Sequence, residues 1–250
     1  MMTGSPTTTV MQPQPGLDVT LREAGHGAPV LVLHGGAGPD SIDSVVTHIA
    51  ANHRALAPIH PGFGDTKRPE TLNSAGDLAH TYLNLLDHIK ACDTTVIGSS
   101  FGGWVATEMA LADDHHRIKK LVLIDAIGPQ IPGHDITTPK PNPAGATAQQ
   151  QPRRGPSPAA LAALRAYTGD GMQDTTLLQR ATRITIPTLL LWGENDPIVT
   201  PDFGRAYARA FPDGRFTLIP GAGHLPMREA PELTYAALDG FLNDPREGHA

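Results

Sequence analysis

A serine flanked by small residues stands where a strand must turn into a helix, and this feature constrains the fold more than any other. The stretch 94–110 reads TTVIGSSFGGWVATEMA, in which a β-branched apolar run ends in glycine and serine and a helical pattern begins at once. Gly98, Ser100 and Gly102 fit the pattern G-x-S-x-G. At such a turn the serine backbone is strained, its hydroxyl projects above the sheet, and only small neighbours fit. The pattern therefore predicts that Ser100 is a nucleophile.

Strand-like and helix-like segments alternate along most of the chain. The apolar runs PVLVLHG, KKLVLIDA and IPTLLLWG are typical of strands buried on both faces, and SAGDLAHTYLNLLDHIKA has one apolar helical face. This alternation predicts an α/β fold with a mostly parallel central sheet and helices on both of its faces. We expect one core domain, formed by residues 17–127 and 181–243, because a chain of 250 residues suits a single core of this kind.

Two stretches depart from the alternation. Residues 128–157 are rich in Pro, Gln and Gly and cannot build a core, and PAALAALRAYTG then has the pattern of a helix begun by proline. An insertion of this size between core strands indicates a lid, so we assign residues 128–180 to a short, proline-rich lid or cap. Residues 1–16 are rich in Thr, Pro and Gln and are predicted to be a loose N-terminal leader.

Two further residues are candidates to activate Ser100. A serine hydroxyl is a weak nucleophile without a base and a group that orients the base. Asp196 lies in LLLWGENDPIV and His224 in LIPGAGHLP, each just after a predicted strand. The order Ser100, Asp196, His224 is the one expected for a triad on this kind of sheet, and the carboxyl ends of parallel strands are where open α/β sheets place their sites. We predict that these three residues form a catalytic triad.

Five motifs follow one another in an order that resembles a known family. HGGAG, PGFGDT, GSSFGG, GENDPIV and GAGHLPMREAPE are together similar to the motifs of α/β-hydrolase-fold proteins, over residues 17–242 except 128–157. The resemblance implies an oxyanion hole made of two backbone N–H groups. One would come from Phe101. The other would come from the glycine turn after His34, with Gly36 as first choice and Ala37 as second.

Three positions near these motifs raise further questions. Asp125, at the end of LVLID, is an alternative acid, because some members of the fold carry the triad acid at that strand end. His34 precedes the glycine turn and is predicted to hold that loop through hydrogen bonds. His60 lies in IHPGFGD, where the family more often has an acidic residue, and the sequence suggests no function for it.

The resemblance implies a serine hydrolase that cleaves a carboxylic ester or lactone through an acyl-enzyme, without a cofactor. Ser100 at the elbow argues against the epoxide hydrolase and haloalkane dehalogenase branches, which use an aspartate there. The alternatives are a carbon–carbon bond hydrolase of a diketone-type substrate, a biosynthetic acyl-transfer or cyclisation enzyme, and a ligand-binding protein on the same scaffold. The lid helix should roof the pocket, with Leu161, Leu164 and Tyr167, together with Ala37 of the glycine turn, facing a small to medium, largely apolar substrate.

We expect a small-molecule substrate, and charge and composition argue against nucleic acid or a membrane as a partner. The net charge of −6 and the absence of a Lys/Arg run argue against nucleic-acid binding, and no apolar run approaches the roughly 18 residues that span a membrane. The chain has one cysteine and its first residues lack the features of a signal peptide, so we expect a cytoplasmic protein. We expect no metal site, since the adjacent His115 and His116 would not share a helical face. Both a monomer and a homodimer are compatible with the sequence.

Overall fold

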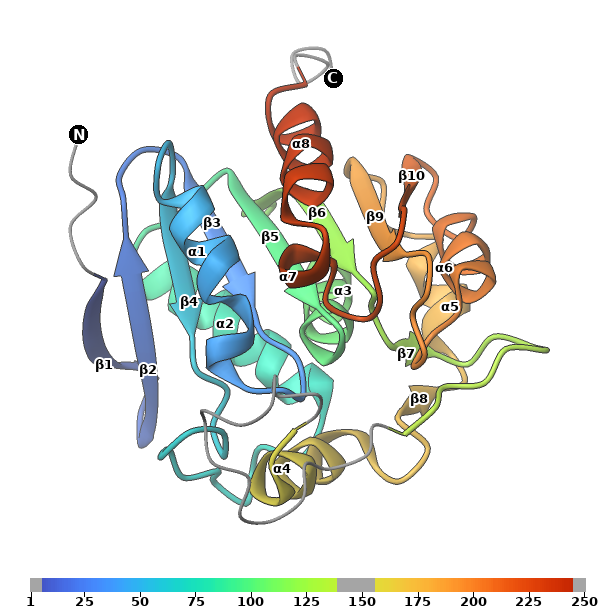
Figure 1. Cartoon of the computed structure of the whole chain (residues 1–250). Helices are drawn as coiled ribbons and strands as arrows, with labels where there is room; N and C mark the ends of the chain where they lie inside the picture. The colour runs from blue at the N-terminus through green and yellow to red at the C-terminus, as the bar shows by residue number, and fades with distance from the viewer. Residues whose placement is uncertain (1–5, 139–155, 245–250) are drawn as a thin grey trace, which may run out of the picture.

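The computed structural model describes residues 6–138 and 156–244, and an eight-stranded sheet forms its centre (Figure 1). The strands are β1 (Thr7–Gln14), β2 (Leu17–Ala24), β3 (Pro29–Leu33), β4 (Arg54–Pro58), β5 (Thr94–Ser99), β6 (Ile118–Ile124), β9 (Thr188–Gly193) and β10 (Gly214–Ile219). Their order in the sheet is β1-β2-β4-β3-β5-β6-β9-β10. β2 pairs antiparallel with both β1 and β4, and the other neighbours are parallel. The predicted mostly parallel α/β sheet is confirmed.

Helices cover both faces of this sheet. A 3-10 turn η1 (Pro39–Ile42), α1 (Asp43–Ile49), α7 (Pro226–Glu229) and α8 (Pro231–Leu242) lie on the face nearer the viewer in Figure 1, and α2 (Ala75–His88), α3 (Phe101–Ala112) and α6 (Pro201–Ala208) lie behind the sheet. Side chains of β3 alternate between the two layers: Val30 and Val32 pack with α1 and α8, whereas Leu31 and Leu33 pack with α2 and α3. Both faces of the central strands are therefore buried, which explains their continuous apolar sequences.

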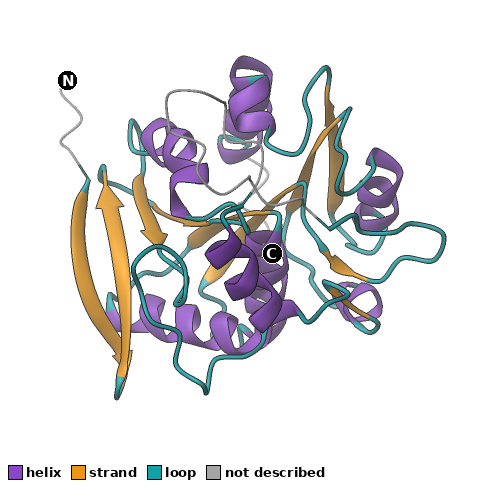
Figure 2. Cartoon of the chain, turned by 60° about the horizontal axis from the view of Figure 1, so that its bottom comes forward, coloured by secondary structure: helices purple, strands orange, loops and turns teal. Residues whose placement is uncertain are grey.

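The predicted cap, residues 128–180, contains α4 (Pro158–Thr168). It begins with the short strand β7 (Gly128–Pro129), which pairs in parallel with a second short strand near its end, β8 (Gln173–Asp174). Ser157 caps α4 by accepting the N–H of Ala160, and Pro158 occupies its first turn. The helix crosses the carboxyl end of the sheet (Figures 1 and 2). α5 (Leu177–Ala181) follows, and its wholly buried Leu177 belongs to the main core, so the chain rejoins the core a few residues before position 181. Residues 139–155 of the expected lid lie outside the described residues.

The predicted loose leader is wrong for residues 7–14, which form the edge strand β1. β1 pairs with β2 through a hairpin in which Gly16 has a φ of 78°. Thr and Val favour extended backbone, and an edge strand tolerates Pro13 because a missing N–H there breaks no ladder on the solvent side. The register shifts between Met11 and Gln14, where this proline lies. The alternation of exposed and buried side chains is weak in β1, which hides the strand from pattern analysis.

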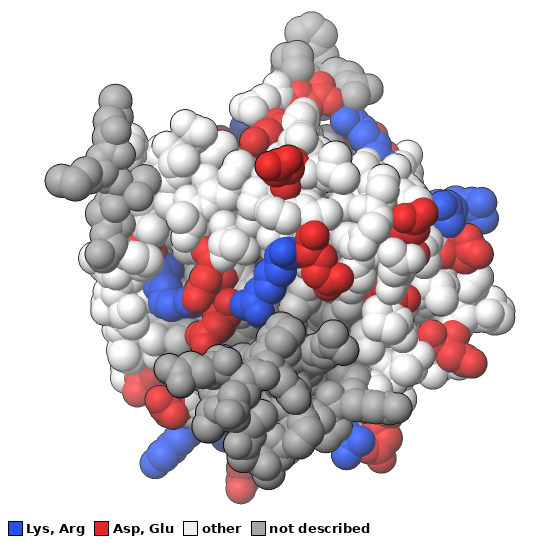
Figure 3. All heavy atoms as spheres, viewed as in Figure 1, with Lys and Arg blue, Asp and Glu red and all other residues white. Residues whose placement is uncertain are grey.

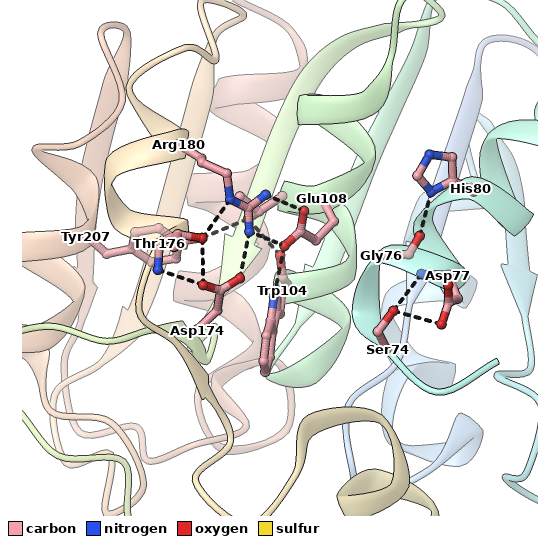
Figure 4. A network of polar contacts seen from close by, with 12 residues as sticks. Ser74, Gly76, Asp77, His80, Trp104, Glu108, Asp174, Thr176, Arg180 and Tyr207 are labelled. Atoms are coloured by element: carbon pink, nitrogen blue, oxygen red, sulfur yellow. Dashed lines mark hydrogen bonds and ion pairs between the residues drawn. The ribbon is translucent and has the colours of Figure 1, made fainter. Parts of the chain in front are cut away.

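A cluster of charged side chains joins the end of the cap to the helix that follows Ser100 (Figure 4). Both terminal nitrogens of Arg180 donate to the carboxylate of Glu108 in α3, each over 2.7 Å. Arg180 also donates to Asp174 over 2.7 Å and to the hydroxyl of Thr176 over 3.1 Å. The indole of Trp104 donates to the same Glu108 over 3.3 Å. Bidentate, charge-assisted bonds of this kind fix geometry as well as adding energy. The cluster therefore attaches the C-terminal end of the cap, residues 174–180, to α3. We call this end the cap base.

The surface has no single dominant sign of charge on the face shown in Figure 3, where Lys and Arg are interspersed with Asp and Glu. No helix among the described residues has the length and apolar character that crossing a membrane requires.

Candidate active site

Ser100 lies in an abrupt turn between β5 and α3, with φ 53° and ψ −117°. Positive φ is costly for a residue with a side chain and persists only where the surroundings enforce it. The surroundings here are glycines. A Cβ at Gly98 would overlap the carbonyl of Gly102, and a Cβ at Gly102 would overlap the carbonyl of Leu33 in the neighbouring strand. The glycines of G-x-S-x-G are therefore required by backbone packing against backbone.

Ser100, His224 and Asp196 form a continuous hydrogen-bonded chain. Nε2 of His224 lies 3.0 Å from Oγ of Ser100, and Nδ1 of His224 lies 2.8 Å from Oδ2 of Asp196. The other carboxylate oxygen of Asp196 accepts the N–H groups of Ile198 over 2.7 Å and Val199 over 3.2 Å. Because Asp196 accepts the Nδ1 proton, Nε2 of the neutral imidazole is left to accept the proton of the Ser100 hydroxyl.

Asp125, the rival acid, has a different partner. Its Oδ1 accepts the N–H of Gly193 over 2.9 Å, and its Oδ2 is buried without a hydrogen-bond partner among the described residues. Burial, with the nearby carboxylate of Asp196, raises the pKa of Asp125 well above its ordinary value. Asp125 thus bonds to the backbone at the end of β9. The imidazole of His224 bonds to Asp196, so the geometry favours Asp196 as the acid.

The N–H groups of Gly36 and Phe101 are both buried and donate to no acceptor within the described part of the chain. The carbonyl at the other end of each of these two peptide groups accepts two hydrogen bonds. The Gly35 carbonyl accepts from Nδ1 of His34 over 2.8 Å and from the N–H of Gly38 over 3.1 Å. The Ser100 carbonyl accepts the N–H groups of Gly103 and Ile127, over 2.9 and 3.3 Å.

Fixing a carbonyl also fixes the N–H on the same planar peptide. Two free N–H groups held in this way are preorganised to bind negative charge that develops nearby. The Gly35 Cα also approaches the elbow closely, since a Cβ there would lie 2.8 Å from Cβ of Ser100. The glycine turn and the nucleophile turn are therefore in direct contact. Ala37 is exposed, which makes its N–H the less suitable alternative.

The cap helix contacts both turns. A Cβ at Gly36 would lie 2.8 Å from Cδ2 of Leu164. The hydroxyl of Tyr167 donates to the carbonyl of Pro61 over 2.8 Å, and its ring stacks on Phe101 with centroids 5.7 Å apart. Leu161 is buried in the same apolar cluster. The helix that the sequence predicted as a roof thus brings Leu164 and Tyr167 to the two turns that carry the free N–H groups.

A metal centre finds no support in the described residues, in which no three His, Cys, Asp or Glu side chains gather as ligands. Sequence reasoning assigned no function to His60 and did not single out Tyr82, although both lie behind the glycine turn. No local signal could identify them together, because Tyr82 bonds to His60 and His60 bonds to His34, and these partners are 22 and 26 positions apart in the sequence.

The fold agrees with the comparison to known proteins. Residues 30–237 match the alpha/beta hydrolase family, and the chain belongs to that family.

Individual relatives differ in the reactions that their names state. Over 119 residues the chain is 30% identical to 2-hydroxy-6-oxo-2,4-heptadienoate hydrolase of Pseudomonas putida, a match that covers 45% of this chain and 42% of that protein. It is 26% identical over 239 residues to Lipase 3 of Moraxella sp. strain TA144, covering 82% of this chain and 74% of the lipase. A thermophilic esterase from Thermogutta terrifontis has the same fold, with a TM-score of 0.76, 22% identity and coverage of 96% and 98% of the two chains.

Proposed function

We propose that this protein is a serine hydrolase that cleaves carboxylic esters or lactones of small to medium, largely apolar substrates. The observation that carries the proposal is the chain of hydrogen bonds from Ser100 through His224 to Asp196, with lengths of 3.0 and 2.8 Å. A nucleophile, a base and a group that orients the base are the three parts that this chemistry needs.

In the first half of the proposed reaction, Oγ of Ser100 attacks the carbonyl carbon while its proton passes to Nε2 of His224. The carboxylate of Asp196 stabilises the resulting imidazolium. The carbonyl oxygen becomes an oxyanion and receives the N–H groups of Gly36 and Phe101. His224 then gives its proton to the leaving oxygen, and the acyl group remains on Ser100.

In the second half, a water molecule attacks the acyl carbon and gives its proton to Nε2 of His224. Collapse of the second tetrahedral intermediate breaks the bond to Ser100 and returns that proton to its Oγ. The product is the free carboxylic acid, and the enzyme is regenerated. Leu164 and Tyr167 would then form the apolar wall against which the acyl or alcohol part of the substrate packs.

A second candidate is hydrolysis of a carbon–carbon bond in a diketone-type substrate. The match to 2-hydroxy-6-oxo-2,4-heptadienoate hydrolase favours it, although that match covers less than half the length of the relative. The match to Lipase 3 covers far more of both chains and favours the ester reaction. Acyl transfer, cyclisation and ligand binding use the same scaffold without hydrolysis, and the substrate screen separates them.

The proposal is tested by intact mass after incubation with a fluorophosphonate, with Ser100→Ala beside the parent protein. We expect one adduct on the parent and none on the variant. The parent protein is then assayed, before and after labelling, on p-nitrophenyl esters, lactones and a 2-hydroxy-6-oxo-dienoic acid. Dominant turnover of the dienoic acid would overturn the ester proposal in favour of the second candidate. An absence of adduct and of turnover would contradict both.

A further inference from the structure

Three buried residues behind the glycine turn are linked by hydrogen bonds that run through both side chains and backbone. The hydroxyl of Tyr82 in α2 lies 2.5 Å from Nδ1 of His60. Nε2 of His60 lies 2.8 Å from the carbonyl of His34, and the backbone N–H of His60 donates to Nε2 of His34 over 3.0 Å. All three side chains have no exposed surface. His60 therefore bonds to His34 twice: its ring bonds to the His34 carbonyl, and its backbone N–H bonds to the His34 ring.

The partners fix where every proton in this chain lies. A backbone N–H can only donate, so Nε2 of His34 is an acceptor and the proton of the neutral ring is on Nδ1, where it donates to the Gly35 carbonyl. A carbonyl can only accept, so Nε2 of His60 carries the proton. Nδ1 of His60 is then the acceptor of the Tyr82 hydroxyl. Each ring is in one defined tautomer, and the assignments are mutually consistent.

Both rings are neutral near neutral pH. Burial lowers the pKa of His60 to about 4, and burial together with the neighbouring His60 holds the pKa of His34 well below its ordinary value. The ring centroids of the two histidines are 3.9 Å apart, so a charge on either would face the other across an apolar interior. The arrangement of donors and acceptors is thus constant over the pH range in which His224 would act as a base.

The chain ends on the peptide group that supplies the Gly36 N–H. His34 donates through Nδ1 to the Gly35 carbonyl, and that carbonyl and the Gly36 N–H are opposite ends of one planar unit. Movement of the His34 ring would rotate this unit and turn the N–H away. The His60 N–H, the His34 ring and the Gly35 carbonyl are bonded in series, and hydrogen bonds in series polarise one another.

We infer that His60, held by Tyr82, is a positioning residue that aims the Gly36 N–H at the oxyanion of the reaction. The inference rests on the proposed function only for what the N–H binds. The linkage itself, from α2 through the loop after β4 to the turn after β3, is a property of the fold. Since removal of one oxyanion donor costs about 100-fold to 1000-fold in rate, loss of its support should cost a part of that factor.

The first test removes only the Tyr82 hydroxyl. Tyr82→Phe is compared with Tyr207→Phe, because Tyr207 is equally buried and its hydroxyl lies 2.8 Å from Oγ1 of Thr107, away from the glycine turn. Each variant loses one buried hydroxyl contact. We expect Tyr82→Phe to lower kcat about threefold to tenfold with KM unchanged, since the oxyanion forms after substrate binding. We expect Tyr207→Phe to leave both constants unchanged.

The second test acts on His60 itself. His60→Leu keeps the apolar volume and removes both side-chain hydrogen bonds, and we expect kcat to fall about tenfold to 100-fold. His60→Gln retains a donor and an acceptor, and we expect it to recover most of that loss. The affinity for an alkyl trifluoromethyl ketone, which forms a tetrahedral oxyanion on the serine, should fall by the same factor as kcat across the series.

A third measurement does not depend on activity. In Tyr82→Phe the His60 amide, which donates to Nε2 of His34, should exchange its hydrogen faster than in the parent, and in Tyr207→Phe it should not. If the fluorophosphonate fails to label the parent protein, the proposed function fails, and this exchange experiment alone decides the linkage. Equal effects of Tyr82→Phe and Tyr207→Phe on kcat, or unchanged exchange at His60, would overturn the inference.

Discussion

The carboxylate of Asp196 lies 2.8 Å from Nδ1 of His224, and it reaches that position from the loop after β9. The neighbouring strand β6 ends at Ile124, and Asp125 follows directly. Two carboxyl groups thus come from adjacent strand ends, and they bond to different partners. Asp196 bonds to the histidine, whereas Asp125 bonds to the backbone of Gly193.

Asp196→Asn and Asp125→Asn should therefore have very different effects on turnover. Asparagine at position 196 would favour the wrong tautomer of His224, and we expect a loss of roughly four orders of magnitude in kcat. Asparagine at position 125 resembles the protonated acid in shape and charge, and we expect less than about a tenfold change. Steady-state kinetics on an ester substrate measures both. A larger loss in Asp125→Asn would identify Asp125 as the acid.

Burial of Asp125 should make the stability of the protein depend on pH. Its pKa is raised in the folded state above the ordinary value of 3.8, so the folded form binds the proton more tightly than the unfolded form. The free energy of unfolding then falls as pH rises from that value toward the folded-state pKa. Asparagine does not ionise, so the free energy of unfolding of Asp125→Asn does not fall in this way. The stability of the variant relative to the parent should therefore improve as pH rises.

This pH effect is measured by urea unfolding at about pH 5 and about pH 8. Asp65→Asn, on an exposed loop, gives the baseline for an aspartate at the surface. A stability difference between Asp125→Asn and the parent that is the same at both pH values would contradict the prediction.

Gly36→Ala should disturb the cap and leave the core folded. Its Cβ would meet the end of the Leu164 side chain, which can shift, whereas a Cβ at Gly98 would meet backbone. We expect Gly36→Ala to fold and to lose about tenfold or more in kcat/KM, because the crowded cap helix no longer sits correctly over the site. Gly98→Ala should fail to fold.

Leu164→Ala provides the complementary half of a double-mutant cycle. If the clash with Leu164 causes the loss, Gly36→Ala in the Leu164→Ala background should cost less than in the parent. Additive effects on kcat/KM would show that the methyl group at position 36 acts directly on the N–H and not through the cap.

Arg180→Met should loosen the attachment of the cap base to α3. The variant loses the bidentate bonds to Glu108 and the bond to Asp174 and leaves two carboxylates close together. We expect the free energy of unfolding to fall by about 1–2 kcal/mol, a decrease of a few degrees in Tm for a chain of this size. Arg183→Met, three residues along and exposed, is the matched control. Equal Tm values for the two variants would rule out the anchoring role.

Much of the fold and the candidate triad could be predicted from the sequence because the relevant signals are local. The buried strands are continuous apolar runs, and a turn that needs glycine on both sides of Ser100 leaves few structural options. Asp196 and His224 each follow such a run, so the topology brings them to one edge of the sheet. The choice between Asp125 and Asp196 could not be made locally, since both follow parallel strands that are neighbours.

The parts that sequence reasoning missed depend on distant partners or on weak patterns. His60 acquires its hydrogen bonds from Tyr82 and His34, which lie 22 and 26 positions away along the chain. Glu108 and Arg180 are 72 positions apart. The strand β1 has little buried surface. Its position is determined by its pairing with β2 and by the hairpin turn between them, and not by hydrophobic burial. Such features follow from the assembled structure and leave no periodic trace.

The pairing of β7 with β8 has a consequence for how this scaffold can diversify. The two ends of the cap meet in a parallel bridge at Gly128–Gln173 and Pro129–Asp174, so the chain leaves the core and returns to it at nearly one point. Closing a longer loop between fixed ends costs little additional entropy. Insertions, deletions or whole exchanges between these two strands can therefore change the roof over the candidate site while the sheet beneath it stays in register.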